Sequence, residues 1–265
     1  MPGLGLIMLN DLPHHRIDLT DAGVQFDAAL APYVQVKGQH LALQVPASGF
    51  LRILVMNAAP EFSLRIHLEA GARLEYGLIS AQSSAQKMQI EAHCLADAHL
   101  VGEHALLNAA SYHESYHIQL EGKAASLTLR GLEYGQEQAV LVHQLRVDHA
   151  ADDTRSDIEF RGVAADQSRV VFNGLIHVPK HIKGVDANEQ TRNILLSNRA
   201  EIDAKPELEI YSHDIACRHG ASIGNLDQNA LFYLQSRGFA LEEARKILIN
   251  AFVESVFDLI RIAPR

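Results

Sequence analysis

Residues 34–224 form a long succession of short segments in which apolar side chains recur at every second position. Examples are residues 41–45 (LALQV), 62–68 (FSLRIHL) and 115–120 (SYHIQL), and small or polar residues separate one segment from the next. Such alternation is typical of half-buried β-strands. No stretch of helical periodicity interrupts the series, so the sequence predicts a mainly β fold.

Three of these segments resemble one another. Residues 72–78 (ARLEYGL), 126–132 (SLTLRGL) and 168–175 (SRVVFNGL) each end in a Gly-Leu pair, where we expect glycine to form a bend or bulge. A recurring strand-and-corner unit suits a β-solenoid, because each turn buries its inner face only against its neighbours. Periodicity alone favours a solenoid slightly over a β-sandwich.

The pattern changes near residue 226. Asp227 is a suitable N-cap and Gly238 a stop signal for one helix, and a second helix is expected over residues 241–260. The second helix begins with Glu242 and Glu243, whose charges suit the positive end of the helix dipole. The sequence thus predicts a β core at residues 1–225 and a C-terminal helical segment at residues 226–265.

The composition excludes several classes of function. A hydrophobic content of 48% with 21% charged residues describes a soluble globular protein, and the net charge of −9 argues against nucleic acid and anionic membranes as partners. Cys94 and Cys217 are too few for a disulfide framework. With no basic leader and no long apolar run in view, we expect a cytoplasmic protein, with Cys94 in its core.

Cys217 and His219 share parity in an extended segment, so both side chains are expected on the same face of a strand. Thiolate and imidazole are well suited to soft metals, including the iron of sulfur clusters. The alternative is a structural role, with Cys217 as a small buried hydrophobe. Five histidines at irregular spacing are expected on exposed strand faces and not in a metal array: His93, His99, His104, His113 and His117.

The C-terminal half resembles the SufB/SufD family of iron–sulfur cluster assembly proteins. The similarity runs in the family's order through residues 147–149 (VDH) to 161–163 (RGV), then 169–178 (RVVFNGLIHV), 186–197 (DANEQTRNILLS), 204–211 (AKPELEIY), 217–221 (CRHGA) and 230–238 (ALFYLQSRG). Gly220 stands where the SufB type of site carries glutamate, so the chain is more similar to the SufD branch. Family members usually carry a helical region before the β core, which suggests a reduced variant here.

The resemblance implies a right-handed parallel β-helix with C-terminal helices. It also implies a non-enzymatic subunit that pairs with a SufB-like scaffold, or with a second copy of itself, and with a SufC-like ATPase. Cys217 and His219 would hold a transient iron–sulfur cluster shared with the partner, and Glu207 and Glu209 would help iron to enter. The ATPase would dock on the C-terminal helices, at Phe232, Tyr233, Ser236 and Arg237. No Walker A sequence is present, so the ATPase step is expected from the partner.

Two other classes of function stay open. One is an interaction scaffold that holds the ATPase without any ligand. The other is a β-solenoid carbohydrate-active enzyme using acids among Asp152, Asp153, Asp157 and Glu159, of which Asp157 and Glu159 are expected on one strand face. The absence of tryptophan, which would stack on sugar rings, argues against the enzyme.

Overall fold

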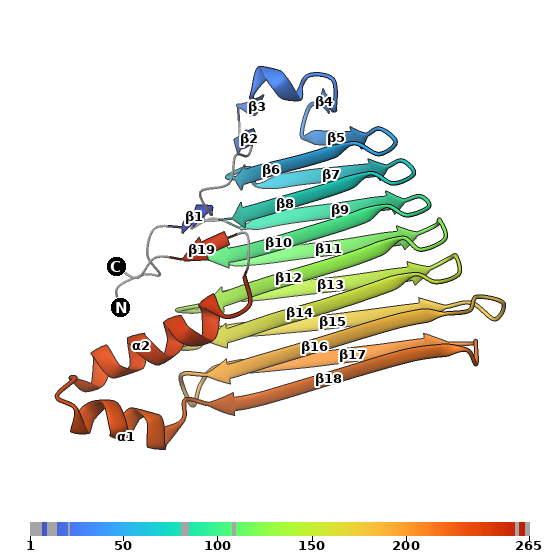
Figure 1. Cartoon of the computed structure of the whole chain (residues 1–265). Helices are drawn as coiled ribbons and strands as arrows, with labels where there is room; N and C mark the ends of the chain where they lie inside the picture. The colour runs from blue at the N-terminus through green and yellow to red at the C-terminus, as the bar shows by residue number, and fades with distance from the viewer. Residues whose placement is uncertain are drawn as a thin grey trace.

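The computed structural model describes residues 7–9, 15–20, 22–80, 85–107, 110–257 and 260–262. Within these ranges, successive strands alternate between two long sheets that stack into a β-solenoid (Figure 1). Strands next but one in the sequence pair in parallel along each sheet, from β6 to β18 in one and from β5 to β17 in the other. The predicted mainly β fold and the solenoid are therefore confirmed.

The first sheet, called sheet 1, has nine strands in the order β18-β16-β14-β12-β10-β8-β6-β2-β3 in the described part of the chain. Their bounds are β2 His15–Thr20, β3 Gly23–Phe26, β6 Phe50–Asn57, β8 Arg73–Ser80, β10 His99–Leu107, β12 Ser126–Gly135, β14 Arg155–Ala164, β16 Val185–Leu195 and β18 Ile215–Asn225. The second sheet, called sheet 2, has eight described strands. They are β4 Val34–Lys37, β5 His40–Val45, β7 Glu61–Leu68, β9 Gln86–Cys94, β11 Ser111–Leu120, β13 Val140–His149, β15 Arg169–Val178 and β17 Glu201–Ile210.

One corner of the solenoid repeats the same backbone conformation from turn to turn. A residue with left-handed φ stands at each passage from sheet 2 to sheet 1 between β5 and β16, and its N–H donates to a carbonyl of the next turn. The residues are Ser48, Gly71, Asp97, Ala124, Asp153 and Gly184. These hydrogen bonds pair backbone N–H and C=O groups that would otherwise lack a partner at the corner. The glycines of the three similar segments do not form these corners, so that interpretation was wrong.

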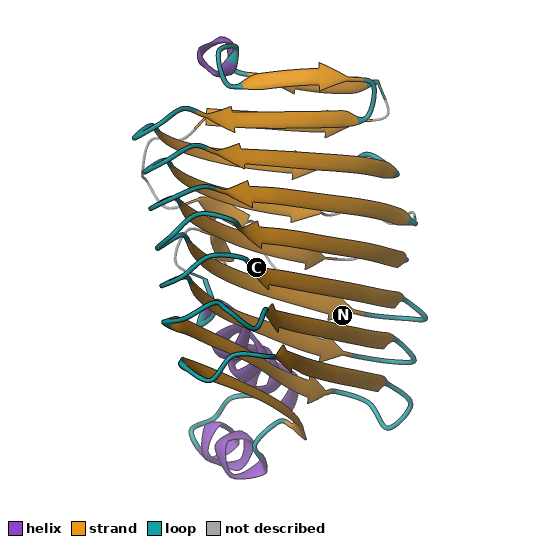
Figure 2. Cartoon of the chain, turned by 90° about the vertical axis from the view of Figure 1, so that its right-hand side faces the viewer, coloured by secondary structure: helices purple, strands orange, loops and turns teal. Residues whose placement is uncertain are grey.

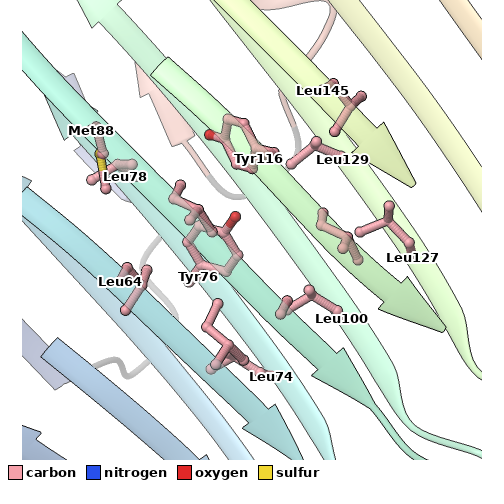
Figure 3. Packing of buried hydrophobic residues seen from close by; sticks show 14 of the residues in the cluster. Leu64, Leu74, Tyr76, Leu78, Met88, Leu100, Tyr116, Leu127, Leu129 and Leu145 are labelled. Atoms are coloured by element: carbon pink, nitrogen blue, oxygen red, sulfur yellow. The ribbon is translucent and has the colours of Figure 1, made fainter. Parts of the chain in front are cut away.

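The interior between the sheets is filled by aliphatic and aromatic side chains from both (Figure 3). Inward glycines make room for large neighbours in this interior. A Cβ on Gly131 would lie 2.0 Å from the Phe160 ring, and one on Gly102 would lie 2.7 Å from the Tyr76 ring. Two of the repeated glycines, Gly131 and Gly174, therefore serve packing within strands and do not bend the chain. Cys94 is fully buried in this core, as expected.

The two ends of the solenoid differ. At the N-terminal end, β3 and β4 run antiparallel to β2 and β5, and the short helix η1 (Ala28–Leu30) lies beside them (Figure 2). At the other end, β17 and β18 are the last strands of their sheets and run parallel to the strands before them. Their outer edges carry no further strand among the described residues, so we call this the open end.

The C-terminal helices α1 (Gln228–Ser236) and α2 (Leu241–Glu254) follow the open end. The Asp227 carboxylate accepts hydrogen bonds from the N–H groups of Asn229 and Ala230, and Gly238 has a φ of +95°, which confirms the predicted cap and stop. Val253 of α2 packs in a second apolar cluster with outward side chains of sheet 1, including Leu132 and Val163.

The expectation that the second helix reaches residue 260 was wrong. The helix ends at Glu254, and Ile260 begins the short strand β19 (Ile260–Ile262), which pairs antiparallel with β1 (Ile7–Leu9). Residue 259, also assigned to that helix, lies outside the described residues. Among the residues described, no helix combines the length and apolar character needed to cross a membrane.

Candidate metal-binding site at the open end

Cys217 and His219 lie on β18, the last strand of sheet 1, and project from the same face of it. Cys217 is half-buried and packs against the solenoid core, whereas His219 is exposed. Burial is the main cause that raises the pKa of the Cys217 thiol. The predicted pair is thus brought together at a sheet edge, where a partner has access to both side chains.

Glu189 lies next to this pair on β16. In the parallel register, Ala187 pairs with Cys217 and Glu189 with His219, so these side chains belong to the inner face of sheet 1. The Glu189 side chain is fully buried, and neither carboxylate oxygen has a hydrogen-bond partner. Burial raises the pKa of this carboxyl to about 7. Sequence reasoning missed Glu189, although its place in the alternation of β16 indicates an inward carboxylate.

Glu207 and Glu209 belong to a different surface. On β17 they alternate with the inward residues Leu208 and Ile210, so both carboxylates lie on the outer face of sheet 2. Glu207 is 2.8 Å from the Lys205 ammonium and lines a shallow groove of about 270 Å³ on that face. The structure therefore separates these glutamates from the Cys217 and His219 face.

The residues expected to bind the ATPase form a surface on α1. Phe232 and Tyr233 are 72% and 57% exposed, and the Arg237 guanidinium lies over the Tyr233 ring at 5.2 Å. The Ser236 hydroxyl donates to the carbonyl of Tyr233. Leu231 is the buried residue that anchors this helix. Two large aromatic side chains that are exposed to solvent on one helix are characteristic of a protein-binding surface.

His104 contradicts the expectation that the clustered histidines lie on exposed strand faces. It is buried in the solenoid interior with Glu114, and its Nδ1 is 2.8 Å from a carboxylate oxygen of that residue. His143 Nδ1 lies 3.2 Å from both Glu114 and Glu133. His104 is buried because it occupies an inward position in the alternation of β10. The Glu114 carboxylate faces it across the interior.

Opposite charges hold this interior cluster together. Burial alone would raise the pKa of Glu114, but His104 and His143 outweigh it and lower the pKa to about 2. Burial alone would lower the pKa of His143, but Glu114 and Glu133 raise it to about 9. Glu114 and His143 are thus each held in the charged form by their partners. Among the described residues, no group of three or more His, Cys, Asp and Glu side chains is arranged so that it could hold a metal ion.

Asp157 and Glu159, two of the acids considered for a carbohydrate-active enzyme, contact arginine side chains. Asp157 and Glu159 do share the outer face of β14, as expected. The Asp157 carboxylate accepts from Arg130 and Asn188, and Glu159 lies 2.8 Å from the Arg161 guanidinium. Burial alone would raise the pKa of Asp157, but Asn188 and Arg130 outweigh it and lower the pKa, whereas a general acid must keep a proton. The arrangement therefore disfavours that enzyme.

Comparison with known proteins agrees with a site that is suited to iron and sulfur. The family model of the SUF system FeS cluster assembly SufBD core domain matches residues 57–252. The chain is 32% identical over 165 residues to iron-sulfur cluster assembly protein SufD of Escherichia coli, covering 62% of this chain and 39% of that protein. It is 38% identical over 101 residues to a SufBD family protein of Synechocystis, covering 38% and 22% of the two chains.

The molecule is a β-solenoid with a cysteine–histidine pair at its open end. The chain belongs to the SufBD core-domain family of the SUF iron–sulfur cluster assembly system. It spans less than half the length of these curated relatives.

Proposed function

We propose that this chain is a SufD-like subunit of an iron–sulfur cluster assembly scaffold and that it works without catalysing a reaction of its own. The family and the SufD relative support a role in cluster assembly. The observation that carries the finer proposal is the position of Cys217 and His219 on the last strand of the open end. A cluster that is built and then released suits few protein ligands from each chain, with the others from a partner.

The open end is the proposed surface for the SufB-like partner or a second copy. Edge strands present unpaired N–H and C=O groups that pair readily with another chain. On β17, Pro206 lacks an N–H, which fits an edge position. A partner strand seated on β18 would cover Cys217 and His219 and would place its own ligands beside them.

The SufC-like ATPase is proposed to dock on α1 through Phe232, Tyr233, Ser236 and Arg237. This surface lies next to the open end along the chain, because α1 begins three residues after β18 ends. Aromatic and arginine side chains are enriched where binding energy is concentrated in protein interfaces. The cytoplasm remains the proposed location, in keeping with two free cysteines.

Co-expression with a SufB-like and a SufC-like protein, followed by affinity purification of this chain, tests the partners. We expect a stoichiometric complex, with Phe232→Ala plus Tyr233→Ala removing the ATPase only. Phe50→Ala is the matched control, because Phe50 is an exposed aromatic residue on β6 near the opposite end. Purification of the wild-type chain without either partner contradicts the proposal.

Anaerobic cluster reconstitution on the purified complex tests the ligands. We expect Cys217→Ala and His219→Ala to reduce cluster formation while the complex stays intact, and Cys94→Ser to leave it unchanged, since Cys94 is buried in the core. If both open-end variants form clusters as the wild type does, the chain is an interaction scaffold without a ligand role.

A further inference from the structure

The outer face of β17 carries a row of acidic side chains at the edge of sheet 2, where the sheet has no further described strand (Figure 1). Five exposed residues alternate there with the inward residues of the strand, and we call them the β17 row: Glu201, Asp203, Lys205, Glu207 and Glu209. Four negative charges and one positive charge give the β17 row a net charge of −3.

Sheet 2 places opposite charges on neighbouring strands at several positions of its outer face. Such cross-strand pairs stabilise a sheet, whereas like charges directly opposite each other destabilise it. Three pairs in register have nitrogen–oxygen distances of 3.7, 3.1 and 3.7 Å: Glu61 with Lys87, Arg65 with Glu91, and Arg169 with Glu201.

The β17 row lacks this match over most of its length. On β15, Asp203 faces Val171 and Glu207 faces Leu175, so neither acid has a basic residue opposite it within the sheet. Lys205 lies 2.8 Å from Glu207 and is the one basic residue of the row. The row therefore presents an excess of negative charge to any strand that pairs with the free edge of β17.

Pairing of β17 with β17 of a second copy brings like charges together. A two-fold axis perpendicular to the sheet makes these two strands antiparallel. With Lys205 opposite its own counterpart, Asp203 faces Glu207 and Glu201 faces Glu209, so every outer pair has like charges. In the neighbouring register Lys205 faces Glu207, but Asp203 then faces Glu209. Neither register compensates two rows that each carry −3.

Pairing of β17 with β18 of a second copy does not supply the missing positive charge either. Arg218 is the one basic residue in the outer row of β18, and its guanidinium lies 3.7 Å from Asp186 of the same chain. The other outer residues of that strand are uncharged: Ala216, Gly220, Ser222 and Gly224.

We infer that the β17 row selects the partner of the open end, which is a different chain whose edge strand presents lysine or arginine at alternate positions. This inference rests on the proposed function of the open end. The main-chain N–H and C=O groups of β17 supply the pairing, as in other cases of strand addition. The row then discriminates against a second copy, because specificity depends on unfavourable contacts with the wrong partner as well as on good contacts with the right one.

The test is a charge-reversed full chain, D203K/E207K/E209K, which changes the net charge of the row from −3 to +3 and keeps Glu201 opposite Arg169. Sedimentation analysis compares each chain alone with the mixture of the two. We expect the mixed pair to associate about tenfold more tightly, or better, than the wild type with itself. The gain should shrink as salt is raised, because salt screens exposed charges.

Two further variants show whether the row itself is responsible. E61K/E91K/E121K makes the same change in net charge at exposed positions of earlier turns and is the matched control. D203N/E207Q/E209Q removes the repulsion and should associate with itself more tightly than the wild type does. A mixture with the charge-reversed chain that is no tighter than the wild type alone, or an equal gain with the control variant, overturns the inference.

Co-purification with the SufB-like protein separates this inference from the proposed function. We expect the charge-reversed chain to lose that protein and to keep the SufC-like ATPase. If the SufB-like protein binds the wild-type and charge-reversed chains equally, the proposed function stands and the inference fails. If it binds neither chain while the mixed pair still associates, the proposed partner is wrong and the selection by charge at β17 stands.

Discussion

Two buried ionisable sites in the solenoid interior differ in how their charge is compensated. Glu114 and His143 compensate each other, so both stay charged, with pKa values moved to about 2 and about 9. Glu189 has no such partner, and burial moves its pKa to about 7. The compensated pair stabilises the fold near neutral pH, whereas Glu189 weakens it there.

The Glu189 carboxyl should make stability depend on pH. Its folded pKa lies above the ordinary 4.5, so its favourable contribution is complete below about pH 4.5 and is lost as pH rises through about 7. The free energy of unfolding of Glu189→Gln minus that of the wild type should therefore increase from about pH 5 to about pH 8, by on the order of 3 kcal/mol. Urea unfolding across this range measures the difference, and a difference that does not change with pH contradicts it.

Gly174 should tolerate no side chain while Glu189 is present. Gly174→Ala should destabilise the protein by about 1–3 kcal/mol, as overpacking does, because the new Cβ meets Glu189 Oε1. In a Glu189→Ala background the same change should cost less, because the clash with the carboxylate is removed and the close contact of the new Cβ with Phe172 Cε1, at 2.8 Å, remains. Thermal or urea unfolding of the four proteins gives the coupling energy. Equal costs in both backgrounds would show that the clash does not decide the effect.

The Arg161 side chain adds polar contacts to the apolar cluster that attaches α2 to the solenoid. The Arg161 guanidinium on β14 donates to the Phe252 carbonyl and the Ser255 hydroxyl, and it also pairs with Glu159. The arginine also lies over the Phe252 ring at 4.9 Å. A planar group with several donors makes these contacts together, which lysine cannot do.

Arg161→Lys should loosen α2 without unfolding the solenoid. We expect faster amide hydrogen exchange over residues 241–257 and little change in β10 to β13, because the solenoid strands keep their own ladder. Arg155→Lys, an exposed position on the same strand, is the control. Uniformly faster exchange across the chain would mean that Arg161 supports the whole core and not the helix alone.

Sequence reasoning recovered the elements that have a local signal. Alternation predicted the strands, and Asp227 and Gly238 predicted the bounds of α1, because a cap and a left-handed stop act on neighbouring residues. The end of α2 and the strand β19 were missed, since pairing with β1 depends on a segment some 250 residues away. The burial of His104 and Glu189 was missed for the same reason, because it depends on which strands face each other across the interior. Cys217 and His219 share a strand, so their common face was predictable.

Stability should fall along the solenoid toward the open end. Each turn is held mainly by its two neighbours, and among the strands that the structure describes β17 and β18 have a neighbour on one side only. Amide hydrogen exchange should therefore be slowest in β11 to β15 and faster in β17 and β18. Adding a partner that covers the open end should slow exchange in those two strands first. Slower exchange confined to α1 would place the partner on the helix instead.

The strand edges at the two ends also bear on how copies of the solenoid assemble. End-to-end growth into a filament requires an adhesive strand edge at both ends of each unit. Here the outer edges of β17 and β18 at the open end, and those of β3 and β4 at the other end, all carry no further strand among the described residues. The open end has parallel strands and the other end antiparallel ones, so pairing between two open ends is an isologous contact that joins two solenoids and uses both open ends.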